Sequence, residues 1–243
     1  MSYIGTKPAD AVLRTQDISD GIVTTDKLAD NSVTTAKTSF QDIPIKNIII
    51  NGDMSIAQRG TSASSVSTTS INTVDRWQLF TQTAGSAVFT VSQDTTVPSG
   101  QGFAKSHKID VTTAHTLASS NQIRFQQKIE GQNLQYLKKG TSNAESLTVS
   151  FWVRSNKTGT YICELYDNDN TRQISKSYTI DSADTWEKKT ITFAGDTTGA
   201  FDNDNAVSLQ LGFWLGAGTN YTSGTLSDTW SSVTDANRAV GQV

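Results

Sequence analysis

The sequence predicts an all-β protein: a β-sandwich or jelly roll of antiparallel strands, preceded by an extended stem. Three observations lead to this fold class. Apolar and polar residues alternate in several segments between residues 75 and 215, the pattern of strands with one buried face. Turn-forming residues separate these segments. Three near-copies of a ten-residue unit open the chain, and repeats this short bury apolar surface only against other copies or other chains.

The repeats begin at Asp10, Asp20 and Asp30, and each has an apolar residue at its fourth position and Thr at its sixth. Because such units have no core of their own, we expect residues 1–45 to form a stem that joins copies of the chain. The expected assembly is a homo-oligomer, a trimer, held together in part by apolar stem residues, namely Val23, Leu28 and Val33.

The remaining residues, 46–243, are expected to form the sandwich. Alternation is clearest at 123–130, 147–153, 190–193 and 207–215, and weaker at 75–80, 87–93, 107–113, 161–166 and 173–180. One segment has a helical pattern, residues 133–139, and Gly140 follows it as a helix-ending glycine. The alternate apolar positions of two of these strands are predicted to be buried: Leu147, Val149, Phe151, Val153, Leu209, Leu211 and Phe213.

Composition argues against several classes of function. The net charge is −3 and no basic cluster occurs, so we expect no nucleic-acid partner. No apolar run approaches the roughly 20 residues of a membrane helix, and the first residues lack the pattern of a secretory signal. Cys163 is the single cysteine, which excludes an intramolecular disulfide and argues against a cysteine-rich zinc site.

The search for catalytic motifs yields no candidate. The two histidines, His107 and His115, lack a metal-ligand spacing, and no nucleophile or phosphate-binding motif occurs. We therefore expect no catalytic residues, no metal, no cofactor and no enzymatic activity. Two Asp-Asn-Asp-Asn runs, 167–170 and 202–205, lack the glycine and glutamate of an EF-hand loop. We interpret them as hairpin turns in preference to cation sites.

Two tryptophans are the strongest local signal for a binding site. Trp152 and Trp214 lie on the side of their predicted strands opposite the alternating apolar residues. Arg154 lies on the same side as Trp152, and Gln210 on the same side as Trp214. Indole rings stack on the C–H faces of sugars, while polar side chains bond the hydroxyl groups, and Tyr166 could extend this platform. The alternative is that these rings fill a subunit interface or the core, where Trp is common.

Four segments, 49–60, 74–77, 128–134 and 147–155, together resemble a family of tailed-phage tail-fibre proteins with a carbohydrate-binding-module-like jelly roll. Proteins of this family often carry ten-residue repeats with the sequence Val-Thr-Thr-x-Lys, which the units beginning at Asp20 and Asp30 share. The resemblance implies a virion protein, a tail fibre or adhesin. It also implies a final strand after residue 243. A sheet that lacks this strand would present an edge to another chain.

The expected function is that of a phage tail-fibre or receptor-binding structural protein, located in the virion. Its partners would be copies of itself, phage tail or other virion proteins, and host surface glycan, without membrane insertion. One alternative is a head-decorating or connecting virion protein that binds no glycan. The other is a glycan-degrading tailspike enzyme.

Overall fold

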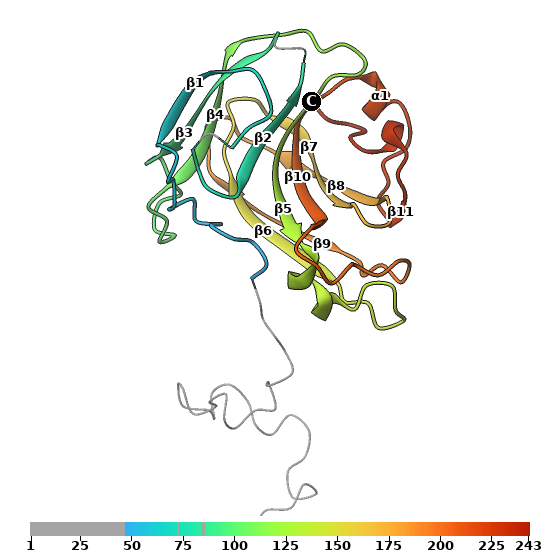
Figure 1. Cartoon of the computed structure of the whole chain (residues 1–243). Coiled ribbons are helices and arrows are strands. Elements are labelled where there is room, and N and C mark those ends of the chain that lie inside the picture. Colours follow the sequence, from blue (N-terminus) through green and yellow to red (C-terminus); the bar gives the residue numbers. More distant parts are fainter. Residues whose placement is uncertain (1–46, 72, 84–85) are drawn as a thin grey trace, which may run out of the picture. The chain divides into compact units, whose positions relative to one another are not determined.

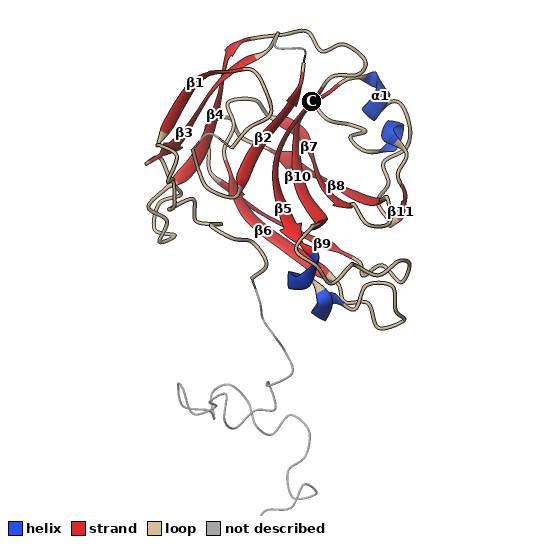
Figure 2. Cartoon of the chain, viewed as in Figure 1, coloured by secondary structure: helices blue, strands red, loops and turns tan. Residues whose placement is uncertain are grey.

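A six-stranded antiparallel sheet is the central element of the structure, a computed structural model (Figures 1 and 2). The structure describes residues 47–71, 73–83 and 86–243. The stem residues Val23, Leu28 and Val33 therefore lie outside the described residues. The order of the sheet is β11-β8-β7-β10-β5-β2. Its strands are β2 (Trp77–Gln82), β5 (Gln122–Glu130), β7 (Gly159–Asp167), β8 (Arg172–Ile180), β10 (Val207–Ala217) and β11 (Ser231–Ser232).

Two smaller antiparallel sheets pack on one face of this central sheet, which we call the core face. One has the order β1-β3-β4, and the other pairs β6 with β9. Buried apolar side chains of the central sheet, such as Leu79 and Leu211, join those of the small sheets, such as Phe89 and Val149. The antiparallel all-β class is therefore confirmed. The five strands are β1 (Ser62–Val66), β3 (Val88–Asp94), β4 (Ser106–Thr113), β6 (Leu147–Val153) and β9 (Glu187–Phe193).

The opposite face of the central sheet, which we call the polar face, is covered in part by the C-terminal segment. The covering segment is 218–243, with the short helix α1 (Thr219–Thr222) and the 3-10 turn η7 (Asp235–Asn237). Its Tyr221 and Ala239 pack on Trp214 and Ile162 of the sheet. Among the described residues, no helix has the length and apolar character needed to cross a membrane.

The predicted strands agree well with the structure, because every segment with period-2 alternation forms a strand. The prediction missed β1 and β11. The predicted helix at 133–139 is wrong: two separate 3-10 turns, η5 (Gly131–Asn133) and η6 (Gln135–Leu137), stand there. Lys138 then adopts a left-handed conformation with a φ of 50°, which ends the second turn before an α-helical hydrogen-bond pattern can develop.

A row of aromatic rings crosses the core between the two layers. Phe125 of β5 stacks on Trp77 with ring centroids 4.6 Å apart, and Phe213 of β10 lies 6.5 Å from Phe125. Phe151 of β6 meets Phe213 edge-on at 4.8 Å. Most of the predicted core is buried, but Leu147, Phe151 and Val153 are only half-buried, so the layer over the core face is incomplete there.

His107 of β4 makes the fold sensitive to acid. Its ring stacks on Phe125 at 4.8 Å, and its Nε2 lies 3.2 Å from Thr73 Oγ1. Burial lowers the pKa of His107 to about 4, against about 6.5 in an unfolded chain. The neutral His107 ring contributes fully to the free energy of unfolding above the unfolded pKa. This contribution, about 3 kcal/mol, is lost as the pH falls from about 6.5 to about 4.

We therefore expect the free energy of unfolding in guanidinium to be lower at a pH of about 4.5 than at about 7. His107→Gln should remove that part of the pH dependence while keeping a polar group near Thr73. If the variant loses as much stability on acidification as the original protein, another group is responsible.

Candidate functional site

The uncovered part of the polar face is the strongest candidate for a binding surface. Strand register places Gln78, Gln126, Gly212 and Glu164 side by side across β2, β5, β10 and β7. Neighbouring positions on this face add more polar and aromatic side chains. Those that reach the surface at least in part are Gln78, Phe80, Lys128, Tyr166, Asn168 and Gln210. Saccharide hydroxyl groups need hydrogen-bonding partners of this kind, fixed on a rigid sheet.

Side-chain amides on this face hold one another in place. Gln126 Nε2 donates to Gln78 Oε1 at 2.8 Å, and Gln210 Nε2 donates to Asn168 Oδ1 at 2.7 Å. In each pair one group stays unused: Gln126 Oε1 and Asn168 Nδ2 are buried without a hydrogen-bond partner among the residues that the structure describes. One acceptor and one donor are thus left to be satisfied, and an unsatisfied buried polar group is costly.

Gly212 is buried in the middle of the polar face, beneath the side chain of Arg124. A Cβ atom built on Gly212 would lie 3.9 Å from Arg124 Cδ. Gln126 and Glu164 lie opposite Gly212 on the two adjacent strands. The missing side chain therefore lets Arg124 reach from β5 across β10 to Glu164 on β7.

Two aromatic rings on the polar face make cation–π contacts with arginine side chains. The Arg124 guanidinium carbon lies 4.5 Å from the centre of the Phe80 ring, and that of Arg238 lies 4.9 Å from the centre of the Tyr166 ring. Phe80 and Tyr166 are half-buried. Cation–π contacts of this kind fix the ring planes, so each ring offers a defined surface.

A buried charge cluster attaches the C-terminal segment to the polar face. Arg238 donates to both carboxylate oxygens of Glu164, at 2.7 and 3.0 Å, and Arg124 approaches the same carboxylate at 3.5 Å. Trp214 Nε1 also donates to it, at 3.2 Å. Burial acts to lower the pKa of Arg238, yet the negative charge of Glu164 raises it above its ordinary value, so Arg238 stays charged.

The predicted site residues divide between two sheets. Tyr166, Gln210 and Trp214 lie on the polar face, but Trp214 is 0% exposed beneath the C-terminal segment. Trp152 lies on β6, in the other layer, half-buried on the side away from the core. Arg154 follows it and bonds the backbone oxygen of Asp184 at 2.8 Å. The two indoles therefore do not form one platform, as the predicted pairing required.

Sequence reasoning missed the glutamines of the polar face. The side chains of β5 on the face opposite Phe125 are polar: Gln122, Arg124, Gln126 and Lys128. This alternation can be read from the sequence, yet it is also typical of an ordinary solvated face. Only the strand order shows that it lies beside Gln78 and Gly212.

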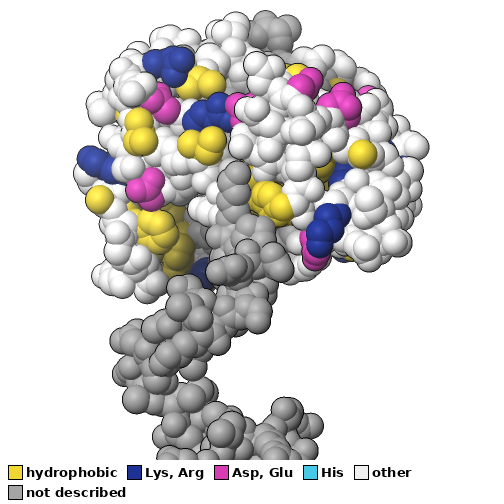
Figure 3. All heavy atoms as spheres, turned by 60° about the horizontal axis from the view of Figure 1, so that its bottom comes forward, with side chains coloured by type: hydrophobic (Ala, Val, Ile, Leu, Met, Phe, Trp, Pro, Cys, Tyr) yellow, Lys and Arg dark blue, Asp and Glu magenta, His cyan; other side chains and the backbone are white. Residues whose placement is uncertain are grey.

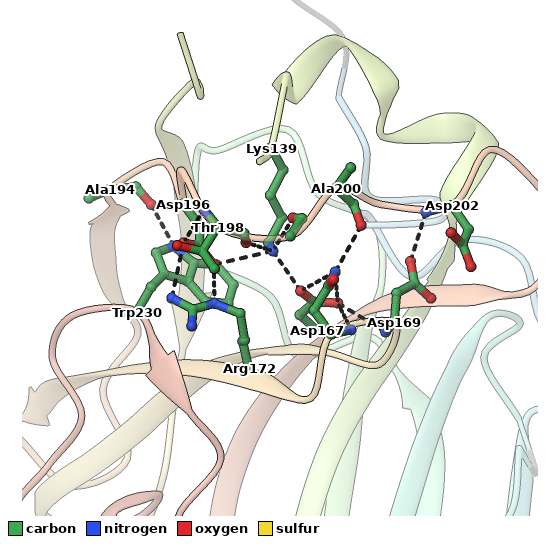
Figure 4. Close-up of polar contacts among 12 residues, drawn as sticks. Lys139, Asp167, Asp169, Arg172, Ala194, Asp196, Thr198, Ala200, Asp202 and Trp230 are labelled. Carbon is green, nitrogen blue, oxygen red and sulfur yellow. Dashed lines mark hydrogen bonds and ion pairs between the residues drawn. The ribbon is translucent and has the colours of Figure 1, made fainter. Parts of the chain in front are cut away.

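A second polar cluster lies at one end of the sheet, around the buried Lys139 (Figure 4). Lys139 Nζ contacts Asp167 Oδ2 at 2.6 Å and Asp196 Oδ2 at 3.2 Å, and it donates to the backbone oxygens of Thr198 and Gly199. Burial acts to raise the pKa of Asp196, but hydrogen bonds from Arg172 hold it below its ordinary value. Two cations thus balance two carboxylates.

The first Asp-Asn-Asp-Asn run forms a turn within this cluster, as interpreted from sequence. Asp167 Oδ1 accepts the backbone N–H groups of Asp169 and Asn170, and Asp169 Oδ2 accepts that of Asp202 in the second run. In the described part of the chain, no three potential metal ligands gather. A pocket of about 450 Å³ lies beside Lys139, but its Gln135 amide is engaged with backbone oxygens.

Comparisons with known proteins show a structural similarity to a phage tailspike domain. No protein-family model matches the chain, and no curated protein matches it. The chain is similar to the enzymatically active domain of tailspike protein 4 from bacteriophage CBA120, with a TM-score of 0.36 and 13% identity. The match covers 68% of this chain and 20% of that chain, so it involves about a fifth of the tailspike.

Proposed function

We propose that this protein is a phage virion structural protein of the tail-fibre or receptor-binding type that binds a host-surface saccharide through its polar face. The stem would anchor it to the tail and join it to further copies, and the sandwich, of the jelly-roll type, would face the host. Binding needs no covalent chemistry. The resemblance of residues 49–60, 128–134 and 147–155 to tail-fibre proteins supports the virion assignment.

The observation that carries the saccharide assignment is the set of partly exposed side-chain amides on the polar face, those of Gln78, Asn168 and Gln210. Amide oxygens accept hydrogen bonds and amide nitrogens donate them, as sugar hydroxyl groups require. Phe80 and Tyr166 provide half-buried rings for C–H contacts on the same face. Each such site would bind weakly, and several copies on one virion would multiply the affinity.

The first test removes a partly exposed amide from the polar face. Gln210→Leu should keep the melting temperature close to that of the original protein, because Gln210 is half-buried and its amide bonds the side chain of Asn168 at the surface. It should weaken binding on an array of host-surface saccharides about tenfold or more, the cost of one lost hydrogen bond.

Trp152→Ala is the matched control, because it removes an accessible indole from the other layer and should leave saccharide binding unchanged. If Trp152→Ala abolishes binding and Gln210→Leu does not, the site is on β6 instead. If the original protein binds no saccharide, the result contradicts this proposal and favours a connecting or head-decorating role. Release of reducing ends from host polysaccharide would indicate a tailspike enzyme.

A further inference from the structure

A glutamine lies among the apolar side chains of β5 on the core face. Ile123, Phe125 and Ile129 occupy alternate positions of the strand and pack in the core, and Gln127, at another of these positions, is 0% exposed. A buried side-chain amide is costly unless its donor and its acceptor are both paired. The presence of a glutamine here therefore depends on what its amide bonds.

The amide of Gln127 pairs with the backbone of Ile50 as a neighbouring strand would. Gln127 Oε1 accepts the Ile50 N–H at 2.9 Å, and Gln127 Nε2 donates to the backbone oxygen of Ile50 at 2.8 Å. A side-chain amide has the same kinds of donor and acceptor as a peptide group, so it holds Ile50 at two points. Trp77 Nε1 adds a third bond, to the backbone oxygen of Asn51 at 3.1 Å. Two buried side chains of the central sheet thus fasten this segment.

The same segment is also fastened to the opposite layer. Gln93 Nε2, on β3, donates to two consecutive backbone oxygens, those of Met54 and Ser55, at 2.7 and 3.0 Å. Since β3 belongs to a small sheet and β5 to the central sheet, the segment ties the two layers together. We call residues 48–56 the strap; they are part of the blue loop that precedes β1 in Figure 1.

The strap is held at a few points, and part of it faces solvent. The Asn51 side chain closes the strap on itself by bonding the N–H and the backbone oxygen of Ile56, each at 2.9 Å. Ile50 and Ile56 are 45% and 49% exposed. Within the described residues, no strand ladder includes the strap. A segment with few buried contacts and no ladder opens more readily than a paired strand.

The place of the strap in the chain determines when it would come under load. It follows the predicted stem in the sequence and precedes β1 (Ser62–Val66). A pull from the N-terminal side therefore acts first on the contacts with Gln127 and Trp77, then on those with Gln93, and then on the ladder between β1 and β3. The strap can come free without breaking any strand ladder.

We propose that the strap is a sacrificial mechanical link with Gln127 as its latch. Under tension from the N-terminal side it detaches before any strand does, and the sandwich stays folded. Release of residues 48–61 would lengthen the chain by at most about 50 Å, which relieves the tension on β1. The source of tension, a virion that holds the stem, rests on the proposed function. The order of detachment does not, and its test uses no saccharide, so the two proposals can fail separately.

Single-molecule force spectroscopy on the full chain tests this order of detachment. One handle joins the N-terminus, and the other joins a cysteine introduced by Thr179→Cys, at an exposed position of β8. The native Cys163 is buried and should not react with the handle. We expect a first step of at most about 50 Å, at a lower force than the step in which the strands separate. The first step should reverse on relaxation, because the sandwich remains folded.

Gln127→Met should lower the force of the first step or abolish the step. The Met side chain has a similar length and fills irregular space in a core, but it cannot bond Ile50. In hydrogen exchange on the full chain, the Ile50 amide should exchange at least about tenfold faster in this variant. Amides of β3 and β5 should keep their protection.

Gln78→Met is the matched control, because it removes a glutamine amide from the opposite face of the sheet, where it bonds Gln126. It should leave the first step and the exchange of the Ile50 amide unchanged. Trp77→Phe is a second test variant that does not depend on the folding of Gln127→Met. It keeps a ring against Phe125 but removes the N–H that bonds Asn51, so the force of the first step should again fall.

Three results would contradict the proposal. A first step much longer than about 50 Å would mean that strands detach together with the strap. An Ile50 amide that exchanges without protection in the original protein would mean that Gln127 does not hold the strap. Equal forces for the first step in Gln127→Met and in the original protein would mean that Gln127 is not the latch.

Discussion

Glu164→Ala should destabilise the protein by about 3–5 kcal/mol, because it leaves buried cations without their counter-charge. Arg238 and Arg124 are each 7% exposed and both approach the Glu164 carboxylate. Trp214 would also lose the acceptor of its indole N–H. Guanidinium denaturation would measure the loss of stability. Hydrogen exchange would show whether the loss begins in segment 218–243, which Arg238 attaches to the sheet.

Asp235→Ala is the matched control for this cluster. Asp235 also pairs with Arg238, at 3.3 Å, but its side chain is 60% exposed. An exposed pair contributes little to stability, so this variant should behave almost as the original protein. Equal effects of the two substitutions would show that the Glu164 carboxylate does not anchor the C-terminal segment.

Lys139→Met should cost a similar amount, about 3–5 kcal/mol, for the opposite reason. It would leave the carboxylates of Asp167 and Asp196, which are 0% and 5% exposed, with Arg172 as the remaining nearby cation. Lys139 is one of the groups that hold the pKa of Asp196 below its ordinary value, so its loss raises that pKa in the folded state. The difference in stability from the original protein should therefore narrow as the pH falls toward about 4 and this carboxylate takes up a proton.

Lys138→Met provides the comparison, because Lys138 is the adjacent residue and pairs with Glu145 on the surface, where both side chains are 54% exposed. Its unfolding free energy should change by less than about 1 kcal/mol. A Lys139→Met protein that is as stable as Lys138→Met at neutral pH would show that the cluster in Figure 4 contributes no net stability.

Period-2 alternation located the strands well because it reports a local property, one buried and one polar face. The strand predicted at 147–153 coincides with β6 (Leu147–Val153). The helical prediction failed at 133–139 because helix propensity is local, whereas Gln135 donates to the backbone oxygens of Gly131 and Asp202. The contact to Asp202, 67 residues along the chain, is one that local propensity does not report.

The candidate site was harder to predict, because alternation does not say which strands become neighbours. Trp152 and Trp214 both lie opposite the apolar residues of their strands, but the two strands belong to different layers. Trp214 is buried by Tyr221 and Ala239, residues whose position over the sheet has no signal in a local pattern. The amide row of Gln78 and Gln126 depends in the same way on the pairing of β2 with β5.

On the face turned forward in Figure 3, basic and acidic side chains are interspersed, with no large area of one sign. Electrostatic steering toward a strongly charged partner would need such an area. A partner that approaches this face would then be recognised through short-range contacts.

The ammonium group of Lys139 is a cation that the polypeptide carries with it. A free ion at the same place would obey mass action, and its contribution to stability would fall as its concentration in the medium fell. Lys139 has a fixed stoichiometry of one per chain and cannot be lost by dilution or taken up by a chelator. The loops that it joins, between β7 and β8 and after β9, therefore keep their geometry whatever the ionic composition of the surroundings.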